Sequence, residues 1–166
     1  LELVPEHGAE ITRVTSLILG AAQQQLPVSH PDYPGIGITN VELSGPTDNP
    51  QADWKNTVRV GSGLVDLNNP ATWTAALDRC PCGTGTCAKM AVLHAKGQLP
   101  LHQKFRHEGI LGIVYTGELL EETKIGGYDA VIPTVGGQSW IYGFNTYVLD
   151  PTDPFTNGFT MGDIWG

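Results

Sequence analysis

Three cysteines, Cys80, Cys82 and Cys87, lie within eight residues of one another, and Gly83 and Gly85 stand between the last two. Glycine has no Cβ, so the backbone here can turn sharply and several amide N–H groups can point into one space. A thiol surrounded by such partial positive charge ionises more easily than a free thiol. The segment therefore predicts a reactive cysteine site, and Cys82, between a proline and a glycine, is its predicted acid–base group.

A helix is predicted over residues 86–96, beginning inside this segment. Its alanines favour helix, and Gly97 is placed to end it. The first amide groups of a helix lack intrahelical acceptors, and the helix dipole adds partial positive charge there. We therefore expect this helix start to bind a carboxylate and to lower the pKa of the Cys82 thiol.

An acidic side chain, Asp78, lies four residues before Cys82. Its carboxylate can accept a hydrogen bond from an ammonium group, while the helix amides bind a carboxylate. The segment thus predicts a receptor for both ends of an amino acid, with the thiol of Cys82 facing the α-carbon.

The same residues allow other interpretations. Cys80 and Cys87 are as well suited to being small core or supporting residues, since free cysteine usually behaves as a small hydrophobe. The three cysteines with His94 could form a metal or iron–sulfur site, but the spacing C-x-C-x₄-C matches none of the usual ligand patterns. We therefore expect no metal.

Two further motifs are weaker. Residues 83–88 fit the G-x-G-x-x-A dinucleotide fingerprint, but no hydrophobic strand precedes them and no acid-terminated strand follows at the right distance. His107 and Glu108 begin like a zinc-protease motif but lack the second histidine, so we interpret them as an ordinary surface pair. Neither motif predicts a cofactor.

The elements that must position the cysteine segment are helices and short strands in a mixed α and β chain. Helical spacing of apolar residues predicts a helix over residues 9–25. Residues 44–54, rich in Gly, Pro and Asn, predict a loop. Alternating or β-branched residues predict strands at 36–43, with a kink, around Val58 and Val60, and at 110–120, 128–135 and 140–149. The turn joining the 110–120 and 128–135 strands is expected at 124–127.

Composition excludes several function classes. The chain of 166 residues fits one domain, and its net charge of −8 without a basic cluster argues against a nucleic-acid partner. A negative surface repels anions at long range, so the site must supply its own local positive potential. No apolar run reaches the roughly 18 residues needed to span a bilayer. The clustered cysteines favour a reducing cytoplasm over a disulfide-stapled secreted domain.

The segment from Asp78 to Thr86, Asp-Arg-Cys-Pro-Cys-Gly-Thr-Gly-Thr, resembles the second active-site motif of the proline racemase family, which includes hydroxyproline 2-epimerases and a hydroxyproline dehydratase. Further stretches resemble the family's second half in the same order: 26–31, 93–99, 126–133, 143–145, 149–151 and 153–155. The resemblance covers nearly the whole chain.

The resemblance implies an α+β fold, one lobe of a two-lobed diaminopimelate-epimerase-like fold, with a mixed, mostly antiparallel sheet wrapped around a central helix. Residues 1–166 would be the second, C-terminal lobe of such an enzyme. The tail from about residue 150, with Phe155, Phe159 and Trp165, is expected to pack on the missing first lobe.

The resemblance also implies roles. Cys82 is the second of two acid–base thiols, Gly83 and Thr84 bind the substrate carboxylate through backbone N–H groups, and Asp78 meets the ring nitrogen. The implied reaction is cofactor-free proton exchange at the α-carbon of proline or 4-hydroxyproline. Because the family's dehydratases resemble this pattern but carry Thr at the position of Cys82, a racemase or epimerase is favoured over a dehydratase-like enzyme.

The expected partners are a small imino acid and the missing N-terminal lobe, and the chain alone is expected to be inactive. A homodimer is an open alternative, while a membrane and nucleic acid are not expected. The rival from another class is a non-catalytic module that binds a small carboxylate at the same helix N-terminus.

Overall fold

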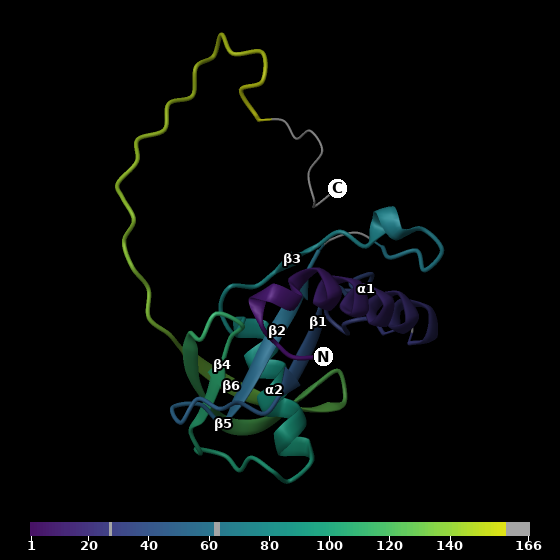
Figure 1. The fold of residues 1–166 in the computed structure, drawn as a ribbon, viewed down its shortest axis with the longest axis vertical. Helices are drawn as coiled ribbons and strands as arrows, with labels where there is room; N and C mark the ends of the chain where they lie inside the picture. The colour runs from purple at the N-terminus through teal and green to yellow at the C-terminus, as the bar shows by residue number, and fades with distance from the viewer. Residues whose placement is uncertain (27, 62–63, 159–166) are drawn as a thin grey trace.

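The computed structural model describes residues 1–26, 28–61 and 64–158, which form one mixed sheet and two α-helices (Figure 1). The elements are η1 (Pro5–His7), α1 (Gly8–Gln25), β1 (Val41–Gly45), β2 (Trp54–Val60), η2 (Pro70–Thr72), β3 (Ala76–Leu77), α2 (Gly83–Ala95), β4 (Phe105–Glu108), β5 (Val114–Ile125) and β6 (Tyr128–Gly136). Within the described ranges, no helix combines the length and apolarity needed to cross a bilayer. The predicted α+β class is confirmed.

The sheet has the order β1-β2-β4-β5-β6, and β3 pairs with β2 outside this path. The β2–β4 pair is parallel and the other pairs are antiparallel, as expected for a mostly antiparallel sheet. The β5–β6 hairpin turns at Gly126 and Gly127, both at positive φ, which glycine adopts without steric cost. The turn lies within the expected residues 124–127, but Lys124 and Ile125 belong to β5, and the strand predicted at 110–120 is found at Val114–Ile125.

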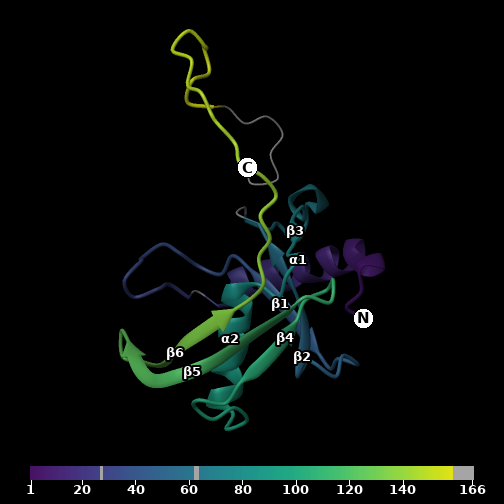
Figure 2. The ribbon, with the colours of Figure 1, turned by 90° about the vertical axis from the view of Figure 1, so that its left-hand side faces the viewer.

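The two helices lie on opposite faces of the sheet, which can be seen at β2, where neighbouring side chains point to opposite faces. Asn56 faces α2, since its side-chain amide reaches the backbone just before that helix. Arg59 faces α1, where its Nε donates to Ser16 Oγ at 3.0 Å. In Figure 2 the β5–β6 hairpin bends along α2, so α2 is the helix that the sheet wraps.

The apolar core lies between α2 and strands β4 and β5. It contains Met90, Leu93, Leu99, Phe105 and Leu119. Helix and sheet approach closely here, since a Cβ added at Gly117 would lie 2.9 Å from Met90 Sδ and 2.7 Å from Thr134 O. This contact fixes the C-terminal half of α2 against the sheet.

Several predicted boundaries are wrong. The first strand begins at Val41, and residues 36–38 are not strand. The helix predicted over 86–96 begins at Gly83. Strands β3 and β4 were not predicted, because they are only two and four residues long and too short to show a period.

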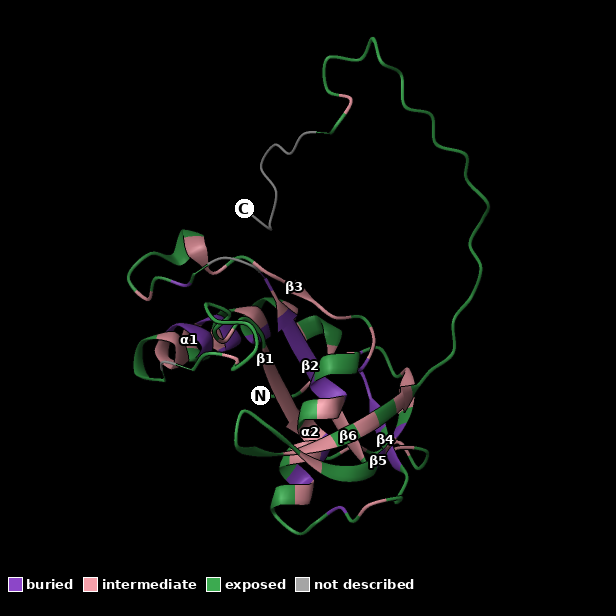
Figure 3. Ribbon diagram, turned by 180° about the vertical axis from the view of Figure 1, so that it is seen from behind, coloured by how far each residue is buried: buried purple, intermediate pink, exposed green. Residues whose placement is uncertain are grey.

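The strand predicted at 140–149 is also absent from the described structure. Figure 3 shows this segment as an exposed chain that leaves β6 and runs away from the sheet. Its apolar side chains have strand propensity but no partner strand here to supply hydrogen bonds and burial. Phe155 is 55% exposed, and Phe159 and Trp165 lie outside the described residues.

Candidate active site

Cys82 caps the N-terminus of α2. Its Sγ accepts a hydrogen bond from the backbone N–H of Gly85 at 3.4 Å. The first helical hydrogen bond runs from Thr86 N to Cys82 O at 2.9 Å. The helix therefore starts inside the cysteine segment with its free amides around the thiol, as the sequence predicts.

The predicted carboxylate-binding residues lie at the open side of this helix start. Gly83 and Thr84 are exposed, and a Cβ added at Gly83 would meet nothing within 4 Å. Cys82 itself is partly buried. A small ligand can therefore approach the amides of the first turn without moving the backbone.

The pKa of the Cys82 thiol moves in the opposite direction to the prediction. Burial above all, with a contribution from Asp78, raises it from 9.0 to about 11, although the backbone amides of Gly85 and Thr84 act to lower it. The expected pKa lowering is wrong because desolvation and a nearby carboxylate outweigh two amide dipoles. In this chain a pKa of about 11 keeps the thiol protonated at neutral pH.

Asp78 lies beside Cys82, as the proposed receptor for an amino acid requires. Its own N–H donates to Val58 O at 2.9 Å, which ties the strand leading to the cysteine segment to β2. Its carboxylate lies close enough to the Cys82 thiol to raise the pKa of that thiol. The structure therefore brings Asp78, Cys82, Gly83 and Thr84 together at one end of α2.

Tyr115 on β5 is a member of this cluster that sequence reasoning missed. Its interaction with Cys80 is the main reason that the pKa of Tyr115 is raised to about 12. The charges of Asp78 and Cys82 contribute to the same shift. No local motif marks Tyr115, because only the sheet topology brings β5 to the cysteine segment.

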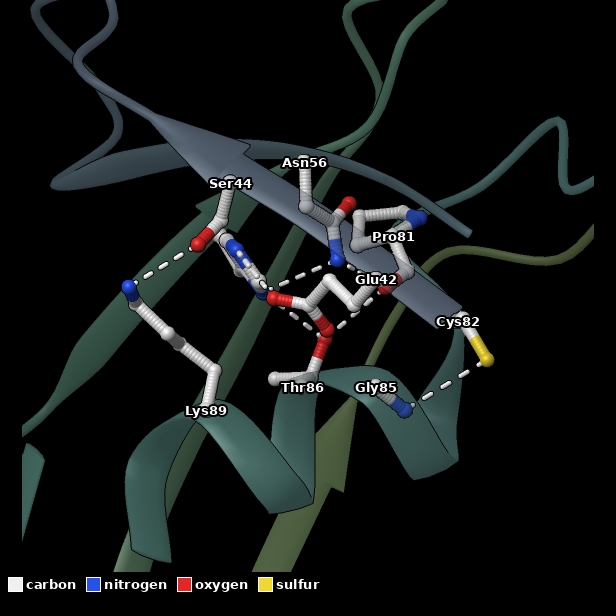
Figure 4. A network of polar contacts seen from close by, with 9 residues as sticks. Glu42, Ser44, Asn56, Pro81, Cys82, Gly85, Thr86 and Lys89 are labelled. Carbon is white, nitrogen blue, oxygen red and sulfur yellow. Dashed lines mark hydrogen bonds and ion pairs between the residues drawn. The ribbon is translucent and has the colours of Figure 1, made fainter. Parts of the chain in front are cut away.

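A buried polar network lies beneath the cysteine segment (Figure 4). Pro81 O accepts hydrogen bonds from Asn56 Nδ2 at 2.8 Å and from Thr86 Oγ1 at 3.1 Å. Thr86 Oγ1 also lies 3.1 Å from His107 Nδ1. Asn56, Thr86 and His107 are fully buried, so these contacts are shielded from water.

Glu42 extends this network from His107, and its side chain is partly buried. His107 Nε2 lies 3.9 Å from Glu42 Oε1. Burial raises the pKa of Glu42 from 4.5 to about 7, and burial together with the charge of Lys89 lowers the pKa of His107 from 6.5 to about 4. Both side chains are therefore held towards their neutral forms.

The interpretation of His107 and Glu108 as a surface pair is wrong. His107 is fully buried and Glu108 is 7% exposed, because both belong to β4 in the middle of the sheet. Glu108 Oε2 accepts a hydrogen bond from Thr47 Oγ1, and Glu108 Oε1 lies 3.9 Å from Lys55 Nζ. A four-residue strand without a hydrophobic period gave no signal for this burial.

His94 does not join the cysteines. It lies at the other end of α2, where Nδ1 is 2.8 Å from Leu99 O and Nε2 is 3.1 Å from Glu122 Oε1. Cys80, Cys82 and Cys87 are free thiols. In the part of the chain that the structure describes, no three His, Cys, Asp or Glu side chains are grouped so that they could hold a metal ion.

The model of the proline racemase family matches residues 1–160. The chain belongs to the proline racemase family. It is 36% identical to the proline racemase of Clostridioides difficile over 97% of this chain and 45% of that protein. It is 42% identical to the proline racemase of Acetoanaerobium sticklandii over 83% of this chain and 38% of that protein.

Solved structures give the same family. A hydroxyproline epimerase from Agrobacterium vitis, with bound trans-4-OH-L-proline, superposes with a TM-score of 0.76 at 31% identity, covering 100% of this chain and 44% of that one. A probable proline racemase from Agrobacterium radiobacter, with bound carbonate, gives a TM-score of 0.76 at 29% identity. The chain thus spans less than half the length of the relatives it matches.

Proposed function

We propose that this chain is the second lobe of an amino-acid racemase or epimerase in which Cys82 exchanges the α-proton of proline or 4-hydroxyproline. The observation that carries the proposal is the thiol of Cys82 at the N-terminus of α2, with helix amides directed at it and Asp78 beside it. Similarity to proline racemases and to a hydroxyproline epimerase with bound hydroxyproline supports the substrate class.

The proposed reaction needs two thiols on opposite faces of the substrate. A thiolate from the first lobe removes the α-proton, and the Cys82 thiol delivers a proton to the other face; in the reverse direction the two exchange roles. The raised pKa of Cys82 suits the delivering role, because it keeps the thiol protonated at neutral pH. No cofactor takes part in either step.

The surrounding groups have complementary roles in this proposal. The exposed amides of Gly83 and Thr84 bind the substrate carboxylate and stabilise the negative charge that develops as the α-proton leaves. Asp78 accepts a hydrogen bond from the ring nitrogen. Once Asp78 is paired with that cation, it raises the pKa of Cys82 less, so substrate binding eases the ionisation of the thiol in the reverse direction.

We also propose that the tail of this chain packs on the missing first lobe. Seven apolar side chains between residues 140 and 149 are 62–98% exposed: Trp140, Ile141, Tyr142, Phe144, Tyr147, Val148 and Leu149. An exposed apolar run of this length is typical of an interaction surface. The relatives contain more than twice the matched length, which is enough for a second lobe.

The three free thiols support a reducing, cytoplasmic location.

The test supplies a first lobe, fused to or mixed with this chain, and follows deuterium uptake at the α-carbon of L-proline and of trans-4-hydroxy-L-proline in D₂O. We expect exchange in the paired protein and its loss in Cys82→Ser. Cys87→Ser is the matched control and should retain exchange. Exchange that persists in Cys82→Ser would contradict the assignment, whereas calorimetric binding of pyrrole-2-carboxylate without exchange would favour the carboxylate-binding module.

A further inference from the structure

The two peptide groups that flank Cys82 are both anchored. On one side Cys82 O accepts the first helical hydrogen bond, from Thr86 N at 2.9 Å. On the other side Pro81 O accepts two side-chain hydrogen bonds, from Asn56 Nδ2 at 2.8 Å and Thr86 Oγ1 at 3.1 Å. Because the carbonyl can only accept, the side-chain atom of Asn56 that faces it must be the amide nitrogen.

This anchoring coincides with an unfavourable backbone conformation. Cys82 has a φ of 60° and a ψ of 123°, in the positive-φ region that non-glycine residues rarely adopt. Such a conformation persists only where the surroundings hold it. Fixing the peptide on each side of Cys82 fixes its φ and ψ, and these angles decide where the Cα–Cβ bond points.

The anchors leave little room for relaxation. A Cβ added at Gly109 would lie 2.8 Å from the backbone of Cys80 and of Pro81, so the end of β4 supports the segment from behind. Figure 4 shows the Cys82 side chain pointing away from the polar network and towards the Gly85 amide. The network therefore acts on the direction of the thiol without touching its sulfur.

The network is poorly arranged for stability alone. Asn56 Oδ1 and His107 Nε2 are buried without a hydrogen-bond partner among the described residues. A buried polar atom left unpaired is unfavourable, and an apolar side chain of similar size at position 56 would avoid it. The asparagine at this position is therefore better explained by the hydrogen bond that its amide nitrogen donates to Pro81 O.

We propose that Asn56, together with Thr86, is a positioning residue that holds the Pro81 carbonyl and thereby directs the Cys82 thiol to the helix amides and the substrate. The catalytic meaning of this inference rests on the proposed function of Cys82. The position of the thiol can nevertheless be tested on this chain alone, without a first lobe and without turnover.

The test measures the pH profile of alkylation by iodoacetamide in a Cys80→Ser, Cys87→Ser background, where Cys82 is the remaining thiol. Asn56→Leu keeps the approximate size of the side chain and removes the donor. In its held position the thiol is partly buried beside Asp78, so release should return its pKa towards the ordinary value. We expect alkylation at about pH 8 to become roughly tenfold faster, which corresponds to about one pKa unit.

Thr57→Val is the matched control. Thr57 is the next residue on β2, equally buried, and its hydroxyl has no hydrogen-bond partner within the described ranges. This variant should keep the parent profile. A second pair serves if Asn56→Leu does not fold: Thr86→Val should shift the profile as Asn56→Leu does, and Thr86→Ser, which keeps the hydroxyl, should not.

An unchanged alkylation profile in folded Asn56→Leu or Thr86→Val would overturn the inference. With a first lobe supplied, Asn56→Leu should lower kcat more than it raises KM, because a misdirected thiol impairs proton transfer and leaves the substrate contacts in place. Failure of the proposed function would appear as absent exchange in the parent protein. The alkylation result would then still stand, so the two failures are distinguishable.

Discussion

The two ends of helix α2 lie in different surroundings. At the C-terminal end, Met90 and Leu93 pack with Leu99, Phe105 and Leu119 in the apolar core. At the N-terminal end, the neighbours are a strained cysteine and a buried network of polar groups, some of them unpaired. The difference indicates that the apolar end stabilises the packing of the helix. The polar end contains features that lower stability and that, in our proposal, direct the thiol of Cys82.

The largest effect should come from the apolar end. Leu119→Ala removes a fully buried side chain from the core and should lower the free energy of unfolding by about 3 kcal/mol. Leu120→Ala, next to it on β5 but 37% exposed, should cost much less. Urea unfolding measures both. If the apolar end does not act on the thiol, folded Leu119→Ala keeps the Cys82 alkylation profile. A large shift in that profile would contradict this separation of the two ends.

Glu42→Gln tests whether the buried polar network at the other end of α2 lowers the stability of the folded chain. The pKa of Glu42 is raised in the folded chain, so the parent loses stability as pH rises from 4.5 to about 7, where the unfolded chain has ionised and the folded chain has not. The Gln variant lacks this loss. Relative to the parent it should gain roughly 2–3 kcal/mol over this window and keep the gain above it.

Urea unfolding of both proteins at a series of pH values measures this difference. The lowered pKa of His107 acts in the opposite direction, since it removes stability as pH falls from 6.5 to about 4. It is present in both proteins and cancels in the comparison. A stability difference that does not change with pH would show that Glu42 ionises normally in the folded chain.

Asp78→Asn tests the groups that act on the thiol directly. Removing the carboxylate removes a charge and a hydrogen bond that raise the pKa of Cys82, so alkylation of Cys82 at about pH 8 should become at least about threefold faster. Asp153→Asn, in the tail, is the control and should have no effect. With a first lobe supplied, Asp78→Asn should lose proton exchange although its thiol is more reactive, which would separate nucleophilicity from catalysis.

At the N-terminal end of α2, the sequence predicts the residue types of the site better than their ionisation. The glycines and cysteines at residues 78–87 predict a helix start inside this segment, three residues later than Gly83, where α2 begins. They also predict four site residues, whose roles stay predictions, because backbone freedom and thiol chemistry are properties of local residue types. The pKa direction of Cys82 was predicted wrongly, because it depends on burial and on the balance between Asp78 and the amides.

The supporting residues could not be predicted for a related reason. Asn56, His107 and Tyr115 come from β2, β4 and β5, and they approach the cysteine segment only through the strand order of the sheet. The turn of the β5–β6 hairpin and the strand at 128–135 could be predicted because their signals are local, whereas the strand predicted at 110–120 is found at Val114–Ile125. The segment 140–149 has the same local signals, but strand formation also needs a neighbouring strand.

The smallest effect on the stability of the isolated chain is expected from the tail, which should affect neither end of α2. Tyr142→Ser with Phe144→Ser replaces side chains that are 98% and 95% exposed, so the free energy of unfolding should change by no more than about 0.5 kcal/mol. The Cys82 alkylation profile should also stay the same. Binding to a separately supplied first lobe, measured by calorimetry, should weaken at least about tenfold, because these rings are proposed to be buried there. A large loss of stability in the isolated chain would show that the tail packs on this lobe instead, and self-association of the parent that the substitutions abolish would point to a homodimer.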